Sequence, residues 1–310
     1  MKSSLRSPAL GQSAVKPRVQ TPTVTVVICT RNRAALLQKC LAAVLRLNPA
    51  PNQLLVVDNS EGNNDTRKVA QDYGARYIIE PVRGLCRARN RALAECETEI
   101  VAFLDDDVTP APDWLALLLS PFEDEQIGAT AGRVITPATV ISDPAQQTPR
   151  TFSNQDPHWF EIATFGGLGL GANMALRKRA CASDKFFDER LGRGAPFEIG
   201  DESYAFAWLL SRGNRVVYIP SAVVHHPPLT RTALDREARN SFTYWLLLFS
   251  EFPNERLNLV RFLVRRLRGK RLAWPRNPQE PGEIVTSSWS VKLKAAWSGL
   301  ILFLRTPKPH

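Results

Sequence analysis

Apolar residues in the first two-thirds of the chain form short continuous runs, and these runs alternate with segments of helical spacing. Because such strands are apolar on both sides, the pattern predicts a parallel sheet that is covered on both faces. The expected strands are 24–30, 54–58, 76–80 and 99–107. Helices are expected between the first two strands, over 84–96 and around 113–119. The fold class is therefore α/β, with a mainly parallel sheet flanked by helices.

Polar side chains follow three of these strands where each strand ends. They are Thr30 to Arg33, Asp58 and the triplet Asp105 to Asp107. In open α/β sheets, ligands bind beyond the carboxyl ends of the strands, so we expect a binding site at this edge. No GxGxxG or P-loop motif occurs, which argues against a dinucleotide fold and a P-loop NTPase.

The acidic triplet is the strongest candidate for a metal site. Three adjacent carboxylates repel one another unless a cation joins them, and hard oxygen ligands suit Mg²⁺ or Mn²⁺. Side chains alternate in direction along an extended chain, so Asp106 is expected to point away from Asp105 and Asp107. One direction can then hold a metal and the other a sugar hydroxyl. A solvated acidic loop is the alternative.

Composition narrows the class of protein. The 310 residues are 44% hydrophobic and 23% charged, as in folded proteins, and no run of about 18 apolar residues predicts a membrane span. The five cysteines form no C-x-x-C pair, so we expect neither a disulfide framework nor a zinc cluster. An odd number of cysteines fits a reducing compartment, with burial favoured over a catalytic thiol.

The net charge of +10 is concentrated at the ends of the chain. Residues 23–229 carry 21 basic and 24 acidic side chains, whereas residues 230–310 carry 15 basic and 6 acidic ones. A helix over 254–272 would gather one apolar stripe with arginines on another side, the stripe being Leu257, Val260, Leu263, Val264 and Leu267. Segment 289–305 repeats this mixture.

Basic amphipathic helices are typical of segments that lie on anionic membrane surfaces. The alternative is that the stripe packs on the core. Nucleic-acid binding ranks below both, because no recognised nucleic-acid-binding motif accompanies the charge, so nucleic acid is not expected as a partner.

The chain resembles the family 2 glycosyltransferases of GT-A fold, in their bacterial branch with CTRNR and DDD motifs. Six motifs in this order carry the resemblance: VVICTRNR, LLVVDNS, GLCRARNRAL, EIVAFLDDDV, GANMALRK and GDESYAFAWLLSRGNRVVYIPSAVVHH. It covers about residues 23–228, which would form the GT-A domain. Residues 1–22 are then expected to be a disordered basic tail, and 229–310 a helical basic extension associated with a membrane surface.

The family's motifs imply roles for single residues. The nucleotide sugar is expected to contact Thr30, Arg31, Asn32, Arg33, Asp58, Arg89, Asp105 and Asp106. Asp107, with Asp105 and His226, is expected to hold Mg²⁺ or Mn²⁺. The glycine-rich run beside the donor sugar and acceptor corresponds to Gly171, Ala172 and Asn173, and we place Trp159 near it as a sugar-stacking residue.

The catalytic base is expected in Gly200-Asp201-Glu202, where the family usually reads G-E-D with the aspartate as base. Alignment on Gly200 and Ala205 puts Glu202 at the base position. We assign the base by its position in the motif and not by the type of acid, because a base must be within reach of the proton that it takes. Asp201 stays open as the alternative base.

The resemblance implies an inverting, metal-dependent glycosyltransferase that moves a sugar from a nucleotide-diphosphate sugar, a UDP-sugar being favoured, to an acceptor hydroxyl. The acceptor would be a saccharide or a lipid-linked one, in envelope polysaccharide or glycolipid synthesis. The protein is expected to be cytoplasmic and peripheral at the inner face of the cell membrane. A metal-dependent nucleotidyltransferase and a catalytically decayed saccharide or nucleotide binder are the alternatives.

Overall fold

A computed structural model describes residues 22–137, 148–182, 186–228, 234–268 and 289–308. Its strands are β1 (Val24–Thr30), β2 (Gln53–Asp58), β3 (Arg76–Ile79), β4 (Ile100–Asp105), β5 (Thr109–Pro110), β6 (Ile127–Ile135), β7 (Arg150–Phe152), β8 (Asn173–Arg177) and β9 (Arg215–His225). Its helices are α1 (Ala34–Val44), α2 (Asn64–Asp72), α3 (Leu85–Glu95), α4 (Trp114–Leu119), α5 (Trp159–Glu161), α6 (Asp201–Ser211), α7 (Leu234–Glu251), α8 (Arg256–Leu267) and α9 (Trp289–Arg305).

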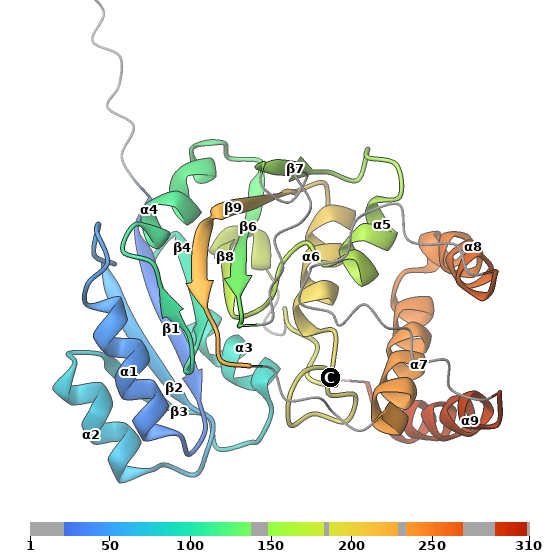
Figure 1. Ribbon diagram of the computed structural model, residues 1–310, viewed down its shortest axis with the longest axis horizontal. Helices are drawn as coiled ribbons and strands as arrows, with labels where there is room; N and C mark the ends of the chain where they lie inside the picture. Colours follow the sequence, from blue (N-terminus) through green and yellow to red (C-terminus); the bar gives the residue numbers. More distant parts are fainter. Residues whose placement is uncertain (1–21, 138–147, 183–185, 229–233, 269–288, 309–310) are drawn as a thin grey trace, which may run out of the picture.

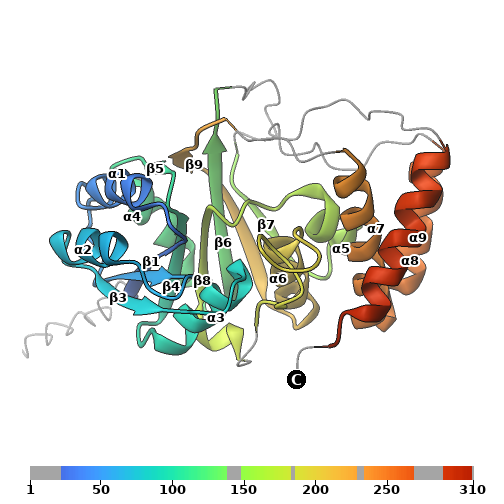
Figure 2. The same cartoon turned by 90° about the horizontal axis from the view of Figure 1, so that it is seen from below.

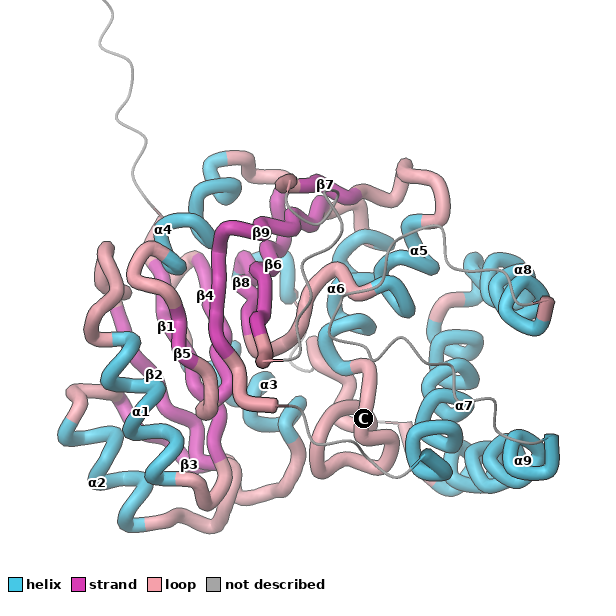
Figure 3. The backbone as a smooth tube through the Cα atoms, viewed as in Figure 1, coloured by secondary structure: helices cyan, strands magenta, loops and turns pink. Residues whose placement is uncertain are grey.

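These strands form one mixed sheet in the order β3-β2-β1-β4-β8-β6-β9-β5, with β7 paired to β9 (Figure 3). The first four strands are parallel, as expected. β8 runs antiparallel to both β4 and β6, while β6 and β9 are again parallel. The expected strand over 99–107 ends at Asp105, so the rest of the aspartate triplet lies in the turn beyond the strand.

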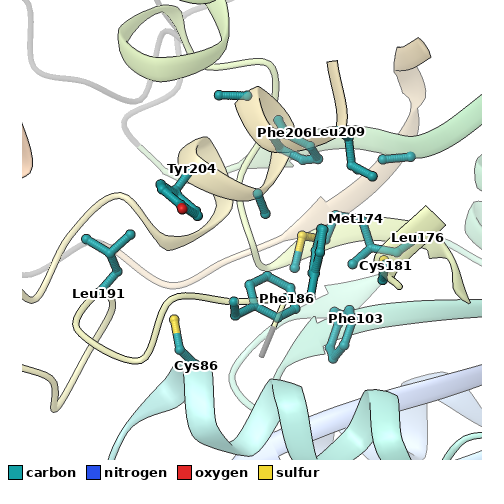
Figure 4. Close-up of a cluster of buried hydrophobic side chains, with 14 of the residues drawn as sticks. Cys86, Phe103, Met174, Leu176, Cys181, Phe186, Leu191, Tyr204, Phe206 and Leu209 are labelled. Carbon is teal, nitrogen blue, oxygen red and sulfur yellow. The ribbon is translucent and has the colours of Figure 1, made fainter. Parts of the chain in front are cut away.

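Apolar side chains on both faces of the sheet build two cores. Val26 and Ile28 of β1 pack in a cluster with residues of α1 and α4. Val27, between them, joins the cluster formed with α3 and α6. Figure 4 shows part of this second cluster, where Phe103 and Met174 lie beneath Phe206. Alternating burial on two sides explains why the strands read as continuous apolar runs.

The C-terminal helices lie at the end of the molecule opposite to α1 and α2 (Figures 1 and 2). Tyr244 of α7 and Leu259 of α8 are buried in the same cluster as α6. Residues 234–267 therefore share the core of the preceding domain instead of standing apart from it. The expected basic tail 1–22 and the start of the extension, 229–233, lie outside the described residues, apart from residue 22.

Helix α8 is apolar on two sides, which corrects the single stripe expected from the sequence. Leu259 and Phe262 face the core, where the Phe262 ring stacks on Phe165 with centroids 4.3 Å apart. The residues of the expected stripe whose side chains are described are exposed instead, namely Leu257, Val260, Leu263 and Val264.

Strand β9 contains a bulge opposite β6. Gly132 pairs with Ile219, but the next residue, Arg133, pairs with Val223, so three residues of β9 are looped out. The side chain of Asn173 fills this bulge by donating to the carbonyl oxygens of Ala222 at 2.8 Å and Arg133 at 2.9 Å. Backbone groups that lose their ladder partners need such a substitute when they are buried.

Candidate active site

Two aspartates of the triplet and one histidine meet at the carboxyl edge of the sheet. Carboxylate oxygens of Asp105 and Asp107 and a ring nitrogen of His226 all lie within 4.8 Å of one another. The strand β4 delivers the aspartates, and β9 ends just before His226. The structure thus brings together the three residues that we expected to hold a metal.

The contact between His226 and the backbone of Pro227 favours one tautomer of the imidazole. Its Nδ1 atom lies 2.6 Å from the carbonyl oxygen of Pro227, and because a carbonyl oxygen can only accept, Nδ1 carries the proton. In the neutral ring, the Nε2 lone pair then faces Asp107 Oδ1 at 3.4 Å. That oxygen is buried without a hydrogen-bond partner. Two facing lone pairs repel, and a divalent cation between them would remove the repulsion.

Asp106 lies outside this group of possible metal ligands, and it does not face an open site. Its side chain is fully buried, accepts from Thr30 Oγ1 at 2.6 Å and from Arg33 Nε at 3.0 Å, and is ion-paired with Arg33. Burial, the largest cause, raises its pKa to about 6. In this conformation Asp106 anchors Thr30 and Arg33 and offers no surface to a nucleotide sugar.

Asp58 is likewise enclosed by protein partners. It accepts hydrogen bonds from Ser60 Oγ and Tyr77 OH, both at 2.7 Å, and from the backbone of Asn63 at 3.1 Å. Its side chain is fully buried, so the expected contact with a nucleotide base has no surface in this conformation. The Tyr77 hydroxyl is the partner that the sequence did not indicate.

The turn after β1 exposes two polar residues beside this edge. Arg31 and Asn32 are exposed, and Asn32 adopts a left-handed φ of 54°, which asparagine tolerates better than most residues. Arg31 donates to the carbonyl oxygen of Asn59, which links the turns after β1 and β2. Arg33 also reaches Asp107 Oδ2 at 3.1 Å. These side chains remain candidates for contact with the donor.

The acids of the Gly200-Asp201-Glu202 motif begin helix α6 and have different surroundings. Asp201 is buried and ion-paired with the guanidinium of Arg89, which is itself 2% exposed. Glu202 is half-buried, and burial followed by the charge of Asp201 raises the pKa of its carboxyl well above the ordinary value. Gly200 has a left-handed φ of 78°, and a side chain there would collide with the Tyr244 ring of α7.

The glycine-rich run is packed into the protein. Asn173 is fully buried and accepts from Trp114 Nε1 at 2.7 Å in addition to its bonds across the β9 bulge. Ala172 is 5% exposed, and a side chain at Gly171 would collide with the guanidinium of Arg89. Asn173 therefore acts here as a structural bridge. Trp159 is half-buried with its ring 5.3 Å from that of Phe160, which leaves its expected role beside a sugar a prediction.

Comparison with known proteins assigns the chain to a family. The model of glycosyl transferase family 2 matches residues 25–181, slightly more than half of the chain. The pre-mycofactocin glycosyltransferase of Mycobacterium tuberculosis H37Rv is 30% identical over 229 residues, which cover 71% of this chain and 45% of that protein. The chain therefore spans less than half the length of that relative. The succinoglycan biosynthesis protein ExoM of Rhizobium meliloti is 26% identical over 240 residues, covering 72% of this chain and 73% of ExoM.

Solved structures agree on the fold. A mannosyltransferase from Pyrobaculum calidifontis, determined in complex with GDP-Man and Mn²⁺, superposes with a TM-score of 0.58 at 16% identity and covers 94% of this chain and 90% of its own. TarS of S. aureus superposes with a TM-score of 0.57 at 15% identity, covering 80% of this chain and 44% of its own. At these identities the likeness concerns the fold alone, which is GT-A. With its sheet, its DDD motif and the match of the family model, the chain belongs to glycosyl transferase family 2.

Proposed function

We propose that this protein is an inverting, metal-dependent glycosyltransferase that moves a sugar from a nucleotide-diphosphate sugar to an acceptor hydroxyl. The observation that carries the proposal is the group formed by Asp105, Asp107 and His226 at the carboxyl edge of a GT-A sheet. Mg²⁺ or Mn²⁺ held there would neutralise the diphosphate as it leaves. The oxygen-rich donor set with one imidazole suits either cation, and Mn²⁺ tolerates the nitrogen better than Mg²⁺ does.

Glu202 is proposed as the base that takes the proton from the acceptor hydroxyl. Its neighbour Asp201 is already ion-paired with Arg89, whereas Glu202 is half-buried in the first turn of α6. A base of raised pKa accepts a proton more readily at neutral pH than an ordinary carboxylate does. One direct displacement by the activated hydroxyl would invert the anomeric centre.

The donor is proposed to be a UDP-sugar, and the acceptor a saccharide or lipid-linked saccharide of the cell envelope. Family membership favours sugar transfer over the nucleotidyltransferase alternative. A thermal-shift panel of UDP-, GDP- and dTDP-sugars with and without Mn²⁺ tests the donor, because a ligand of the native state raises the melting temperature. Release of nucleoside diphosphate from the stabilising donor would support transfer. Release of pyrophosphate, or no metal-dependent shift with any donor, would refute it.

The exposed face of α8 supports a peripheral location at the inner face of the cell membrane. Leu257 is 59% exposed and Val260 42%; Arg261 on the same helix is exposed, and so is Arg268 just after the helix ends. In α9, Leu293 and Trp297 are also exposed, each at 67%. The sequences of α8 and α9 contain no acidic residue, so neither helix repels an anionic lipid surface through charges of its own.

No helix in the described ranges has the length and apolar character needed to cross a bilayer. Contact with lipid would therefore be interfacial for this part of the chain. Co-sedimentation with vesicles of anionic phospholipid at low salt tests the contact, with zwitterionic vesicles as control. Absence from the anionic pellet would refute the membrane part and leave the transfer chemistry untouched.

A further inference from the structure

Arg89, in the second turn of α3, is a fully enclosed cation. Its side chain is 2% exposed, and its guanidinium carbon lies 5.9 Å from the ring centroid of Phe103 and 5.5 Å from that of Phe187. Gly171, just before β8, lies against it, and any side chain at this position would collide with the guanidinium. The expected contact between Arg89 and a nucleotide has no open surface in this arrangement.

The charge of Arg89 is shared between two acids from distant parts of the chain. One terminal nitrogen is ion-paired with Asp201, at the start of α6. The other lies 3.8 Å from Asp105 Oδ1, at the end of β4. A buried cation is stable only beside compensating charge, so each acid restricts where the guanidinium can lie.

We infer that Arg89 is a positioning residue that ties the acceptor side of the site to the donor side through Asp201 and Asp105. The inference rests on the proposed function, in which Glu202 activates the acceptor and Asp105 belongs to the donor-binding edge. Asp201 directly precedes Glu202, so fixing its carboxylate fixes the first turn of α6 and the direction from which Glu202 approaches. Asp201 is then an anchor, and the reversed order of the two acids leaves Glu202 as the base.

Gly171 lies against the guanidinium of Arg89 and leaves the space that this group occupies. Because the absence of a side chain at 171 leaves room for Arg89, substitution there would move the cation without removing its charge. This provides two independent ways to disturb one contact. Arg91, two residues along α3, is exposed and pairs with Glu95 at 2.8 Å, so Arg91→Met is the matched control on the same helix.

The test separates turnover from donor binding in the full-length protein. We expect Arg89→Met and Gly171→Ala to lower kcat about 100-fold, the usual cost of misplacing a reacting group by about 1 Å. The Kd for UDP with Mn²⁺ should change less than about 3-fold, and Arg91→Met should change neither quantity. Arg89→Lys, which keeps the charge, should recover part of kcat.

Two results would overturn the inference. A Kd for UDP raised 10-fold or more at unchanged kcat would make Arg89 a donor contact. An unchanged kcat in folded Arg89→Met and Gly171→Ala would show that Arg89 does not control the position of Glu202 relative to the donor-binding edge. If Arg89→Met does not fold, Gly171→Ala and Arg89→Lys decide the question on their own.

A double-mutant cycle, measured by thermal unfolding, tests this inference independently of the proposed function. The melting temperatures of Arg89→Met, Asp201→Asn and the double variant need no substrate. We expect the double variant to lose less than the sum of the single losses, since either change alone leaves a buried charge unpaired. Additive losses would refute the coupling. A wild-type protein that transfers no sugar from any donor would instead refute the proposed function.

Discussion

His226 Nε2 faces Asp107 Oδ1 across 3.4 Å, and the backbone oxygen of Pro227 holds the proton of this imidazole on the opposite nitrogen. The facing atoms belong to residues that follow β4 and β9, two strands far apart along the chain, and they define the proposed metal position together with Asp105. Their relation leads to the first prediction.

His226→Ala should raise the Mn²⁺ concentration needed for half-maximal activity by at least about 10-fold, because one ligand is lost. His225→Ala is the matched control, since His225 is exposed and lies outside the group. Metal titration of the initial rate measures both. Equal metal dependence in the two variants would show that His226 is not a metal ligand.

Alanine substitutions of Asp106 and Asp107 should affect different properties, stability in the first case and metal binding in the second. Asp106→Ala removes the acceptor of Thr30 and Arg33 inside the protein and should cost about 1–3 kcal/mol in free energy of unfolding. Asp107→Ala should abolish the Mn²⁺-dependent thermal shift with a smaller loss of stability. Urea unfolding and thermal shift separate the two. A metal-dependent shift that persists in Asp107→Ala would contradict the proposed site.

The pH dependence of kcat/KM should report the pKa of the proposed base, Glu202. The pKa of Glu202 is raised by burial and by Asp201, and the base acts only when deprotonated. Activity should therefore fall as the pH decreases through this raised pKa, with the acidic limb above the ordinary glutamate value of about 4.3. Glu202→Gln should remove nearly all turnover while UDP binding persists. An acidic limb at or below the ordinary value would argue for another base.

Opposite sides of α8 should respond differently to substitution. Leu259 is 1% exposed, so Leu259→Ala should cost about 2–5 kcal/mol in free energy of unfolding. Val260→Ser, on the exposed side, should change stability by less than about 0.5 kcal/mol and weaken binding to anionic vesicles. Vesicle binding that is unaffected by Val260→Ser would place any membrane contact elsewhere.

Much of the fold followed from local patterns. The strands β1, β2 and β4 were predictable because burial on both faces leaves continuous apolar runs, and the polar residues after them marked the edge where the proposed metal ligands lie. The α8 pattern was ambiguous, because a helix that is apolar on two sides has the same short-range spacing as one with a single stripe.

The partners of buried charges could not be predicted in the same way. Arg89 and Asp201 are separated by 112 positions, and nothing in either segment identifies the other. The same holds for Tyr77, whose hydroxyl encloses Asp58, and for Trp114, which donates to Asn173. Motifs indicated which residues gather at the edge of the sheet. They did not indicate which of them face outward and which are already satisfied inside.

The looped-out residues of β9 determine how far that strand extends. At roughly 3.3 Å per residue, a regular β9 would carry His226 about 10 Å further, well past the carboxylates it now faces. The amide of Asn173 stabilises the shortened path through its bonds to Arg133 and Ala222. The position of the proposed metal ligand His226 thus depends on an asparagine that need not touch the ion, and a change at position 173 would alter the proposed site by lengthening a strand.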